Sequence, residues 1–292
     1  MENANNVTCL TLEGHVELQK YRYTYFMITF TVCVLIVCCN SVVIAVIYTN
    51  NHLHEPMYIF IAALLCNALF GATALYPKLL IDLLSERQVT YYHTCLLQAF
   101  CIYIYAAAEF TLLSAMAYDR YVSICKPLQY STLLKIYTLK KLLFVCWFLP
   151  CSENSVGIIL TSRLPLCKFT LNRIYCENYS VIKLSCGDTS VNNLYGLFVF
   201  SVAMFSAAIF IIYSYIRILA VCLRNSKDFR RKALQTCLPF HFHYFFIEFL
   251  IIPPLFNPII YGLKMHEILK RIQMLFSWKN GTRVFFLNFS VQ

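Results

Sequence analysis

The chain has 292 residues, of which 60% are hydrophobic, 16% aromatic and only 13% charged, and its mean hydropathy is +0.63. Soluble domains carry about 25% charged residues, so this composition excludes a disordered chain, argues against a cytosolic enzyme and indicates a polytopic membrane protein. The net charge of +10 comes without a nucleic-acid-binding motif, and we interpret it through membrane topology.

Five segments are long and apolar enough to cross a bilayer as helices, which takes about 20 residues. They are residues 23–48, 56–77, 92–118, 142–161 and 192–216, and the third and fourth contain one acid each, Glu109 and Glu153. The segments are longer than the roughly ten-residue strands of a transmembrane β-barrel and lack period-2 alternation, so we predict an all-α bundle. The polar N-terminal segment shows no removable signal peptide, and the first helix is expected to act as the insertion signal.

Orientation follows from the distribution of Lys and Arg, which favour cytoplasmic segments. With the N-terminus outside, 16 of the 24 Lys and Arg residues lie in inside segments and 8 in outside segments. We therefore predict an extracellular N-terminus (1–22), a transmembrane domain (23–263) and a C-terminal tail (264–292). Only 31 residues separate Lys232 from Lys264, whereas two spans and a loop need more than about 40. The number of spans after residue 232 and the side of the tail stay open.

Several short motifs lie at the ends of these segments. They are LHEPMY at 53–58, MAYDRY at 116–121, ICKPL at 124–128, Ser214-Tyr215, KALQTC at 232–237 and PPLFNPIIY at 253–261. With these motifs in this order, the chain resembles olfactory receptors of the rhodopsin-like G-protein-coupled receptor superfamily. The resemblance covers about residues 20–240 and 250–272, and the motif sequences are most similar to those of fish receptors. The resemblance implies a seven-helix plasma-membrane receptor that binds small odorants and activates a heterotrimeric G protein of the stimulatory, olfactory type.

The resemblance also assigns switch residues near the cytoplasmic face. Asp119, Arg120 and Tyr121 end the third segment; in the family, the Arg is held by the neighbouring acid at rest and meets the G protein on activation. The alternative is an Arg that only reaches from the apolar boundary toward water. Asn257, Pro258 and Tyr261 would form a hinge near the cytoplasmic face, and the alternative is a plain proline kink.

Glu109 lies about three turns inside the third segment, where a carboxylate is costly and suggests function. Other rhodopsin-like receptors place an Asp on the second helix, where this chain has Ala68, beside Asn67. We therefore expect Glu109, with Asn40 of the first segment, to form an intramembrane polar or ion site. A protonated structural Glu is the alternative.

Fifteen cysteines cannot all pair, and those inside the helices are interpreted as small apolar residues. Four lie on the outside, where disulfides are permitted: Cys95, Cys167, Cys176 and Cys186. Four cysteines allow three pairings. The resemblance selects Cys95–Cys176 and Cys167–Cys186.

The outer half of the bundle is the expected ligand site. The candidate lining residues are Ile102, Tyr103, Tyr105, Ala106 and Ala107; the alternative is close helix packing by the small residues. Two glycosylation sequons lie on outside segments, at Asn6 and Asn178, and two more, at Asn280 and Asn288, lie in the tail.

The sequence shows no metal-ligand spacing, phosphate-binding loop or nucleophile motif, so we expect no cofactor and no enzyme activity. It also lacks the internal repeat that a transporter would show. Compared with the family pattern, roughly 25–30 residues are missing between the sixth-helix motif and Pro253. The sixth-helix region is therefore expected to be truncated and too short for a complete transmembrane span. The alternative function is a signalling-incompetent product of a pseudogene or a mis-predicted gene.

Overall fold

The computed structural model describes residues 9–14, 21–224, 254, 257 and 268, with only the helical path given for 222–224. The long helices are α1 (Arg22–Thr49), α2 (Pro56–Leu84), α3 (Tyr92–Cys125), α5 (Ile136–Ser162) and α7 (Ser190–Arg224). The short helices are η2 (Asn51–Leu53), η3 (Pro127–Gln129), α4 (Tyr130–Leu133) and α6 (Asn178–Ile182), and the strands are β1 (Cys9–Leu12), β2 (Val89–Tyr91) and β3 (Thr170–Leu171). The expected sixth-helix region, the final helix motif apart from Pro254 and Asn257, and nearly all of the tail lie outside the described residues.

The five long helices are each long and apolar enough to cross a membrane. They coincide with the five predicted segments, and the prediction of a polytopic helical bundle is confirmed. Their outward surfaces carry large exposed apolar side chains, such as Leu194, Leu197 and Phe198 on α7. In water such a surface would be unfavourable, but it matches the apolar interior of a bilayer.

Some predicted helix ends are wrong. The second helix does not end at Pro77 but continues to Leu84, and α5 likewise contains Pro150. A proline removes one backbone donor, but a membrane helix tolerates this loss when neighbouring groups compensate. The turn after Pro77 is stabilised by an ion pair between Lys78 Nζ and Asp82 Oδ1 at 2.6 Å.

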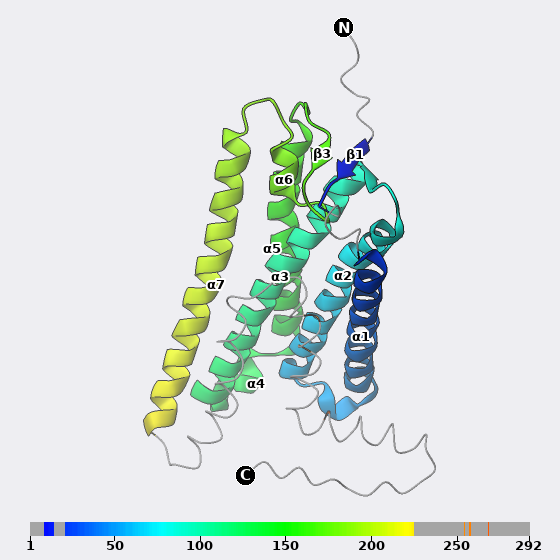
Figure 1. The fold of residues 1–292 in the computed structure, drawn as a ribbon. Helices are drawn as coiled ribbons and strands as arrows, with labels where there is room; N and C mark the ends of the chain where they lie inside the picture. The colour runs from blue at the N-terminus through cyan, green and yellow to red at the C-terminus, as the bar shows by residue number, and fades with distance from the viewer. Residues whose placement is uncertain (1–8, 15–20, 225–253, 255–256, 258–267, 269–292) are drawn as a thin grey trace, which may run out of the picture.

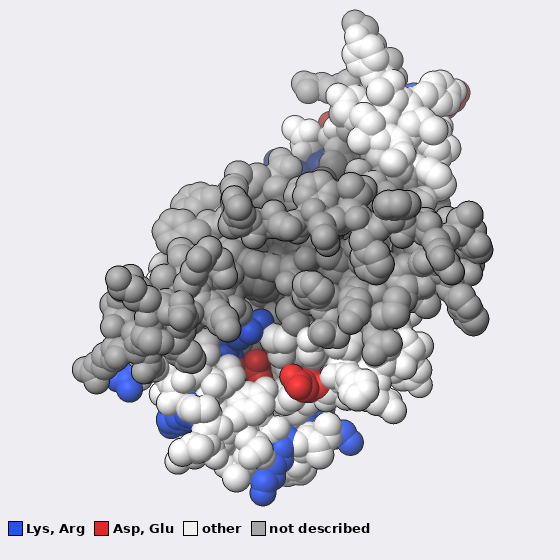
Figure 2. All heavy atoms as spheres, turned by 90° about the horizontal axis from the view of Figure 1, so that it is seen from below, with Lys and Arg blue, Asp and Glu red and all other residues white. Residues whose placement is uncertain are grey.

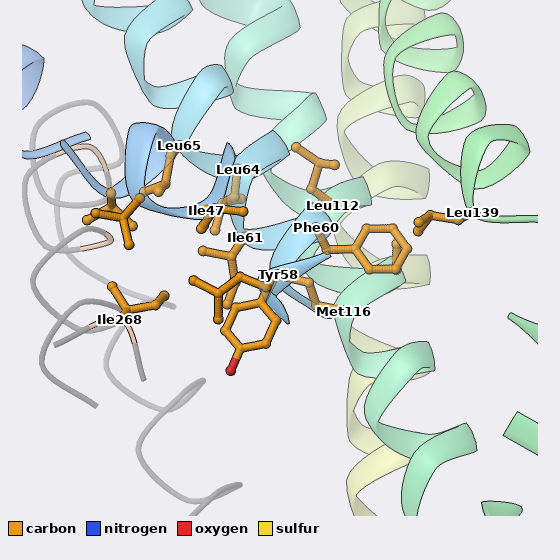
Figure 3. Close-up of a cluster of buried hydrophobic side chains, with 14 of the residues drawn as sticks. Ile47, Tyr58, Phe60, Ile61, Leu64, Leu65, Leu112, Met116, Leu139 and Ile268 are labelled. Carbon is orange, nitrogen blue, oxygen red and sulfur yellow. The ribbon is translucent and has the colours of Figure 1, made fainter. Parts of the chain in front are cut away.

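Helix α3 lies at the centre of the described bundle and contacts α2, α5 and α7, while α1 packs against α2 (Figure 1). A large cluster of buried apolar side chains joins α1, α2, α3 and α5 in the half of the bundle away from the N-terminal strand (Figure 3). In it Phe60 of α2 and Leu112 of α3 are fully buried, and the Phe60 ring points toward Leu139 of α5. This packing holds α3 in a fixed position relative to its neighbours.

A small sheet lies at the upper end, beside the N-terminus (Figure 1). Strand β1 is central, antiparallel to β2 and parallel to β3, so the order is β2-β1-β3. Leu10 and Leu12 are buried and alternate with exposed Cys9 and Thr11, as a half-buried strand requires. The sequence predicted residues 1–22 only as a polar extracellular segment, and the strand β1 was not predicted.

Candidate functional site

A cavity of about 410 Å³ lies between α3, α5 and α7, in the half of the bundle nearer the sheet. Its volume falls within the range of small-molecule sites, about 300–1,000 Å³. The lining residues come from α3 (Tyr103, Ala106, Ala107, Phe110), α5 (Glu153, Asn154, Gly157, Ile158, Leu160), α6 (Asn178) and α7 (Asn192, Tyr195, Gly196, Val199, Phe200, Ala203, Met204). The site is therefore mainly apolar, with a few polar side chains.

Three of the five predicted ligand residues line this cavity. Tyr103, Ala106 and Ala107 lie on one face of α3, at the spacing that brings residues of neighbouring turns together. Ile102 and Tyr105 do not line this cavity, because their side chains pack on the side of α3 that faces α2. Ile102 packs in a cluster with residues of α1 and α2, and the ring of Tyr105 lies against Gly71 of α2.

The wall formed by α5 and α7 was not predicted. Tyr195 of α7 donates a hydrogen bond from its hydroxyl to the backbone oxygen of Glu153 on α5 at 2.8 Å. This bond connects the two helices beside the cavity. The sequence signal that could have found the wall was Glu153 itself, an acid within a membrane helix.

Two disulfides stabilise the loop between α5 and α7 at the end of the bundle nearer the sheet: one joins the loop to α3 and the other lies within the loop. Cys95 at the start of α3 is bonded to Cys176, and Cys167 is bonded to Cys186. These are the two pairs that the resemblance selects. The backbone N–H of Cys176 also donates to Gln98 Oε1 at 3.0 Å, so the loop is held to α3 by a covalent bond and a hydrogen bond.

The loop places Asn178 at the cavity. Asn178 is a lining residue, and its Oδ1 is buried without a hydrogen-bond partner. Asn178 stays a predicted glycosylation site, and its buried Oδ1 at the cavity wall also suits a ligand contact. The other predicted sequon, Asn6, lies outside the described residues.

A separate polar cluster surrounds Glu109, on the α3 face turned away from the cavity. Asn67 Nδ2 donates to Glu109 Oε2 at 2.9 Å, and Asn257 Nδ2 donates to Glu109 Oε1 at 3.1 Å. Asn67 Nδ2 also bonds the backbone oxygen of Tyr105 at 3.0 Å. Two amide donors thus satisfy a carboxyl group that is 3% exposed.

Asn40 belongs to the same layer but does not touch Glu109. Its Nδ2 donates to the backbone oxygens of Ile36 at 2.7 Å and Pro254 at 2.8 Å, so it connects α1 to a residue of the final motif. Ala68 is fully buried and has no polar group. The neighbouring Asn67 is the residue of α2 that reaches Glu109, a role that sequence analysis did not assign.

At the lower end of α3, Asp119 is buried and Arg120 and Tyr121 are half-buried. Among the described residues the ion pairs are Lys78–Asp82 and Arg173–Glu177, so the expected Asp119–Arg120 pair is not formed. Instead, Tyr130 of α4 donates its hydroxyl to Asp119 Oδ1 at 2.9 Å. Neighbouring residues of a helix point in different directions, and α4 supplies the donor that Arg120 does not.

Burial, and then the charge of Asp119, raise the pKa of the Tyr130 hydroxyl above its usual value. Tyr130 is therefore protonated, and able to donate, throughout the physiological range. Seen from below, Lys and Arg side chains lie around two acidic patches on the described part of this end (Figure 2). Of the predicted hinge residues, Asn257 binds Glu109, whereas Pro258 and Tyr261 lie outside the described residues.

Within the described part of the chain, no group of three or more His, Cys, Asp or Glu side chains is placed to hold a metal ion. The fold and the site together define a multi-pass helical membrane protein with a small-molecule-sized cavity under a disulfide-fastened loop.

Comparison with known proteins identifies the family. A family model described as olfactory receptor matches residues 29–247. Human olfactory receptor 6N1 is 31% identical over 94% of this chain and 98% of its own length, and human olfactory receptor 51E1 is 31% identical over 94% and 95%. Human olfactory receptor 52D1 is 35% identical over 81% of this chain and 84% of its own length. The chain belongs to the olfactory receptor family of rhodopsin-like G-protein-coupled receptors and is not an enzyme.

Proposed function

We propose that this chain is a plasma-membrane receptor that binds a small odorant in the cavity between α3, α5 and α7. The observation that carries the proposal is the cavity itself, about 410 Å³ of mainly apolar space in the outer half of the bundle. Tyr103, Ala106 and Ala107 would contact the ligand from α3. The Cys95–Cys176 bond would hold the loop in place over the ligand.

Arg120 would meet a heterotrimeric G protein of the stimulatory type, together with Asp119 and Tyr121. Asp119 accepts its hydrogen bond from Tyr130, and Arg120 makes no ion pair among the described residues, so Arg120 is available for this contact. The cluster of Glu109, Asn67 and Asn257 would act as the intramembrane polar site and connect α2 and α3 to the proposed hinge at Asn257, Pro258 and Tyr261. Asn6 and Asn178 remain the proposed glycosylation sites.

The second candidate is a signalling-incompetent receptor product, and sequence length favours it. The alignment with olfactory receptor 6N1 has 308 positions but takes in 94% of the 292 residues, about 274, so about 34 positions have no residue in this chain. If about 34 further residues were added to the 31 between Lys232 and Lys264, the segment would be long enough for two spans and a loop. Without a full sixth span, the outward helix movement that opens a G-protein site has no rigid element to carry it.

Cyclic AMP measured in cells that express the full chain together with a stimulatory G protein separates the two candidates. Surface staining of the same cells shows whether the chain leaves the endoplasmic reticulum. An odorant-evoked rise that the Arg120→Ala variant loses supports the receptor, and surface delivery without any response supports the incompetent product. Glycosylation mapping of Asn280 and Asn288 adds the topology, because sugar on either residue places the tail outside.

A further inference from the structure

The cavity contains an acid without a counterion. Glu153 lies on α5, nine residues before the helix ends at Ser162, which corresponds to a depth of about 13 Å at 1.5 Å per residue. Among the described residues its carboxylate makes no ion pair, and the hydrogen bond recorded for Glu153 uses its backbone oxygen. A carboxylate at this depth is costly, so a partner from outside the chain would relieve a real penalty.

The groups that face Glu153 across the cavity are aromatic and neutral. Tyr103 and Phe110 come from α3, and Tyr195 and Phe200 come from α7; the Tyr195 hydroxyl is close enough to interact electrostatically with Glu153. The lining residues include no Lys, Arg or His. An acid among aromatic rings is the combination that attracts an organic cation, because ring faces carry negative charge density.

Two more polar atoms at the site lack partners. Asn178 Oδ1 is a buried acceptor, and Asn192 Nδ2 is a buried donor. Together with the two carboxylate oxygens, the cavity therefore offers at least three acceptor atoms that have no partner among the described residues. Three acceptors suit an ammonium group, which has up to three donors to place.

We propose that the preferred ligands are small hydrophobic amines in their protonated form, with Glu153 as the counterion. This inference rests on the proposed odorant-binding function. An alkyl ammonium group has a pKa near that of Lys, about 10.4, and is charged at neutral pH. The ammonium binds Glu153 and Asn178 Oδ1, and the hydrocarbon part packs against Phe110, Phe200 and the small residues of α3.

Ligands of other charge fit this cavity less well. A carboxylic acid would bring a second negative charge next to Glu153 with no lining cation to offset it, and like charges at close range repel strongly in a low-dielectric site. A neutral alcohol could bind Asn192 or Glu153, but it would leave the carboxylate without a counterion. The predicted order of affinity is amine, then alcohol, then carboxylate.

The test uses the purified full chain in lipid nanodiscs at pH 7, with concentration-dependent shifts in thermal unfolding as the measure of binding. Cyclohexylmethylamine, cyclohexylmethanol and cyclohexanecarboxylate share one ring and differ in the polar group. The first variant is Glu153→Gln, which keeps the side-chain shape and removes the charge. The control is Glu86→Gln, which removes an exposed acid from the loop after α2, away from the cavity.

We expect wild type and Glu86→Gln to bind the amine at least about tenfold more tightly than the alcohol. Hydrogen bonds to charged groups contribute about 1.5–3 kcal/mol, so Glu153→Gln should weaken amine binding by about 10- to 100-fold while alcohol binding changes less than about threefold. Retained alcohol binding shows that the variant is folded. A further variant, Glu153→Lys, should reverse the order and favour the carboxylate.

The outcomes separate the two levels of the argument. If the alcohol binds but the amine binds no better, or if Glu153→Gln keeps the amine preference, the amine assignment is wrong and the odorant-binding proposal stands. If none of the three compounds, nor a wider odorant panel, shifts the unfolding of wild type, both proposals fail.

Discussion

A close contact between α2 and α3 provides a sharp test of the packing. Gly71 of α2 faces Tyr105 of α3, and a Cβ atom at position 71 would lie 2.6, 2.7 and 2.9 Å from the Tyr105 ring atoms Cδ2, Cγ and Cε2. Cγ is the ring atom nearest the backbone, so rotation of the ring about its own axis cannot remove the overlap. Tyr105 is 1% exposed and has no free space to enter. The Gly71→Ala variant must therefore shift the side chain or separate the helices.

The cost can be isolated with a matched variant. Overpacking of a well-packed interior costs about 1–3 kcal/mol. Replacing a helical Gly by Ala also brings an intrinsic gain of about 0.5–1 kcal/mol, which would hide part of that cost. Gly196 of α7 provides the correction, because a Cβ there meets nothing within 4 Å. The difference in unfolding free energy between Gly71→Ala and Gly196→Ala is thus the overpacking cost alone, about 1–3 kcal/mol.

Thermal unfolding of the two purified variants in the same detergent measures this difference. Gly71→Ala should unfold about 2–12 °C below Gly196→Ala, taking about 2–4 °C per kcal/mol for a large domain. Adding Tyr105→Leu should restore much of the loss, because the ring that collides is gone; a double-mutant cycle measures this coupling. If Gly71→Ala unfolds at or above the temperature of Gly196→Ala, the close contact of α2 with α3 is wrong.

Three other predictions follow from single contacts. Cys176→Ser removes the bond to α3 and should destabilise the chain by about 2–5 kcal/mol in thermal unfolding, whereas Cys9→Ser, at an exposed free thiol, should change it little. Tyr130→Phe removes the donor to a buried carboxylate and should cost about 1–3 kcal/mol in the same assay; an unchanged unfolding temperature would contradict the bond. Gly14→Ala would place a Cβ within 2.4 Å of the Arg173 backbone carbon and should therefore release β1 from the sheet. The expected result is faster protease cleavage of the N-terminal segment, and cleavage at the wild-type rate would argue against the docked strand.

The helices were predictable because lipid leaves the chain few choices. A segment in hydrocarbon must satisfy its own backbone groups, so about 20 apolar residues define a span almost without regard to context. The ends of the spans were less predictable, since there water can again bond the backbone. Pro77 shows this difference: the apolar segment predicted a span over residues 56–77, whereas the helix continues to Leu84.

The outer sheet and the cavity wall depend on contacts that the sequence does not display. Residues 9–12 alternate for only four positions, too few to predict a strand, and they are ordered by pairing with residues 89–91 and 170–171. On α3 three of the five predicted residues line the cavity, but the sequence did not specify which face of the helix turns toward it. Ile102 and Tyr105 share one face and Tyr103, Ala106 and Ala107 another, and only packing against α2 determines which face meets the cavity.

The two acids inside membrane helices, Glu109 and Glu153, have different surroundings that the sequence alone does not distinguish. Both carry the same desolvation penalty in principle, and either could have been structural or functional. Glu109 receives amide donors from Asn67 and Asn257, so the protein itself compensates for its burial. Glu153 receives no side-chain donor from the described residues and borders a cavity of about 410 Å³. Glu109 has hydrogen-bond partners within the chain and can therefore hold helices together. Glu153 borders a cavity instead, so we infer that its partner is the ligand, and the charge of the ligand is the property to test first.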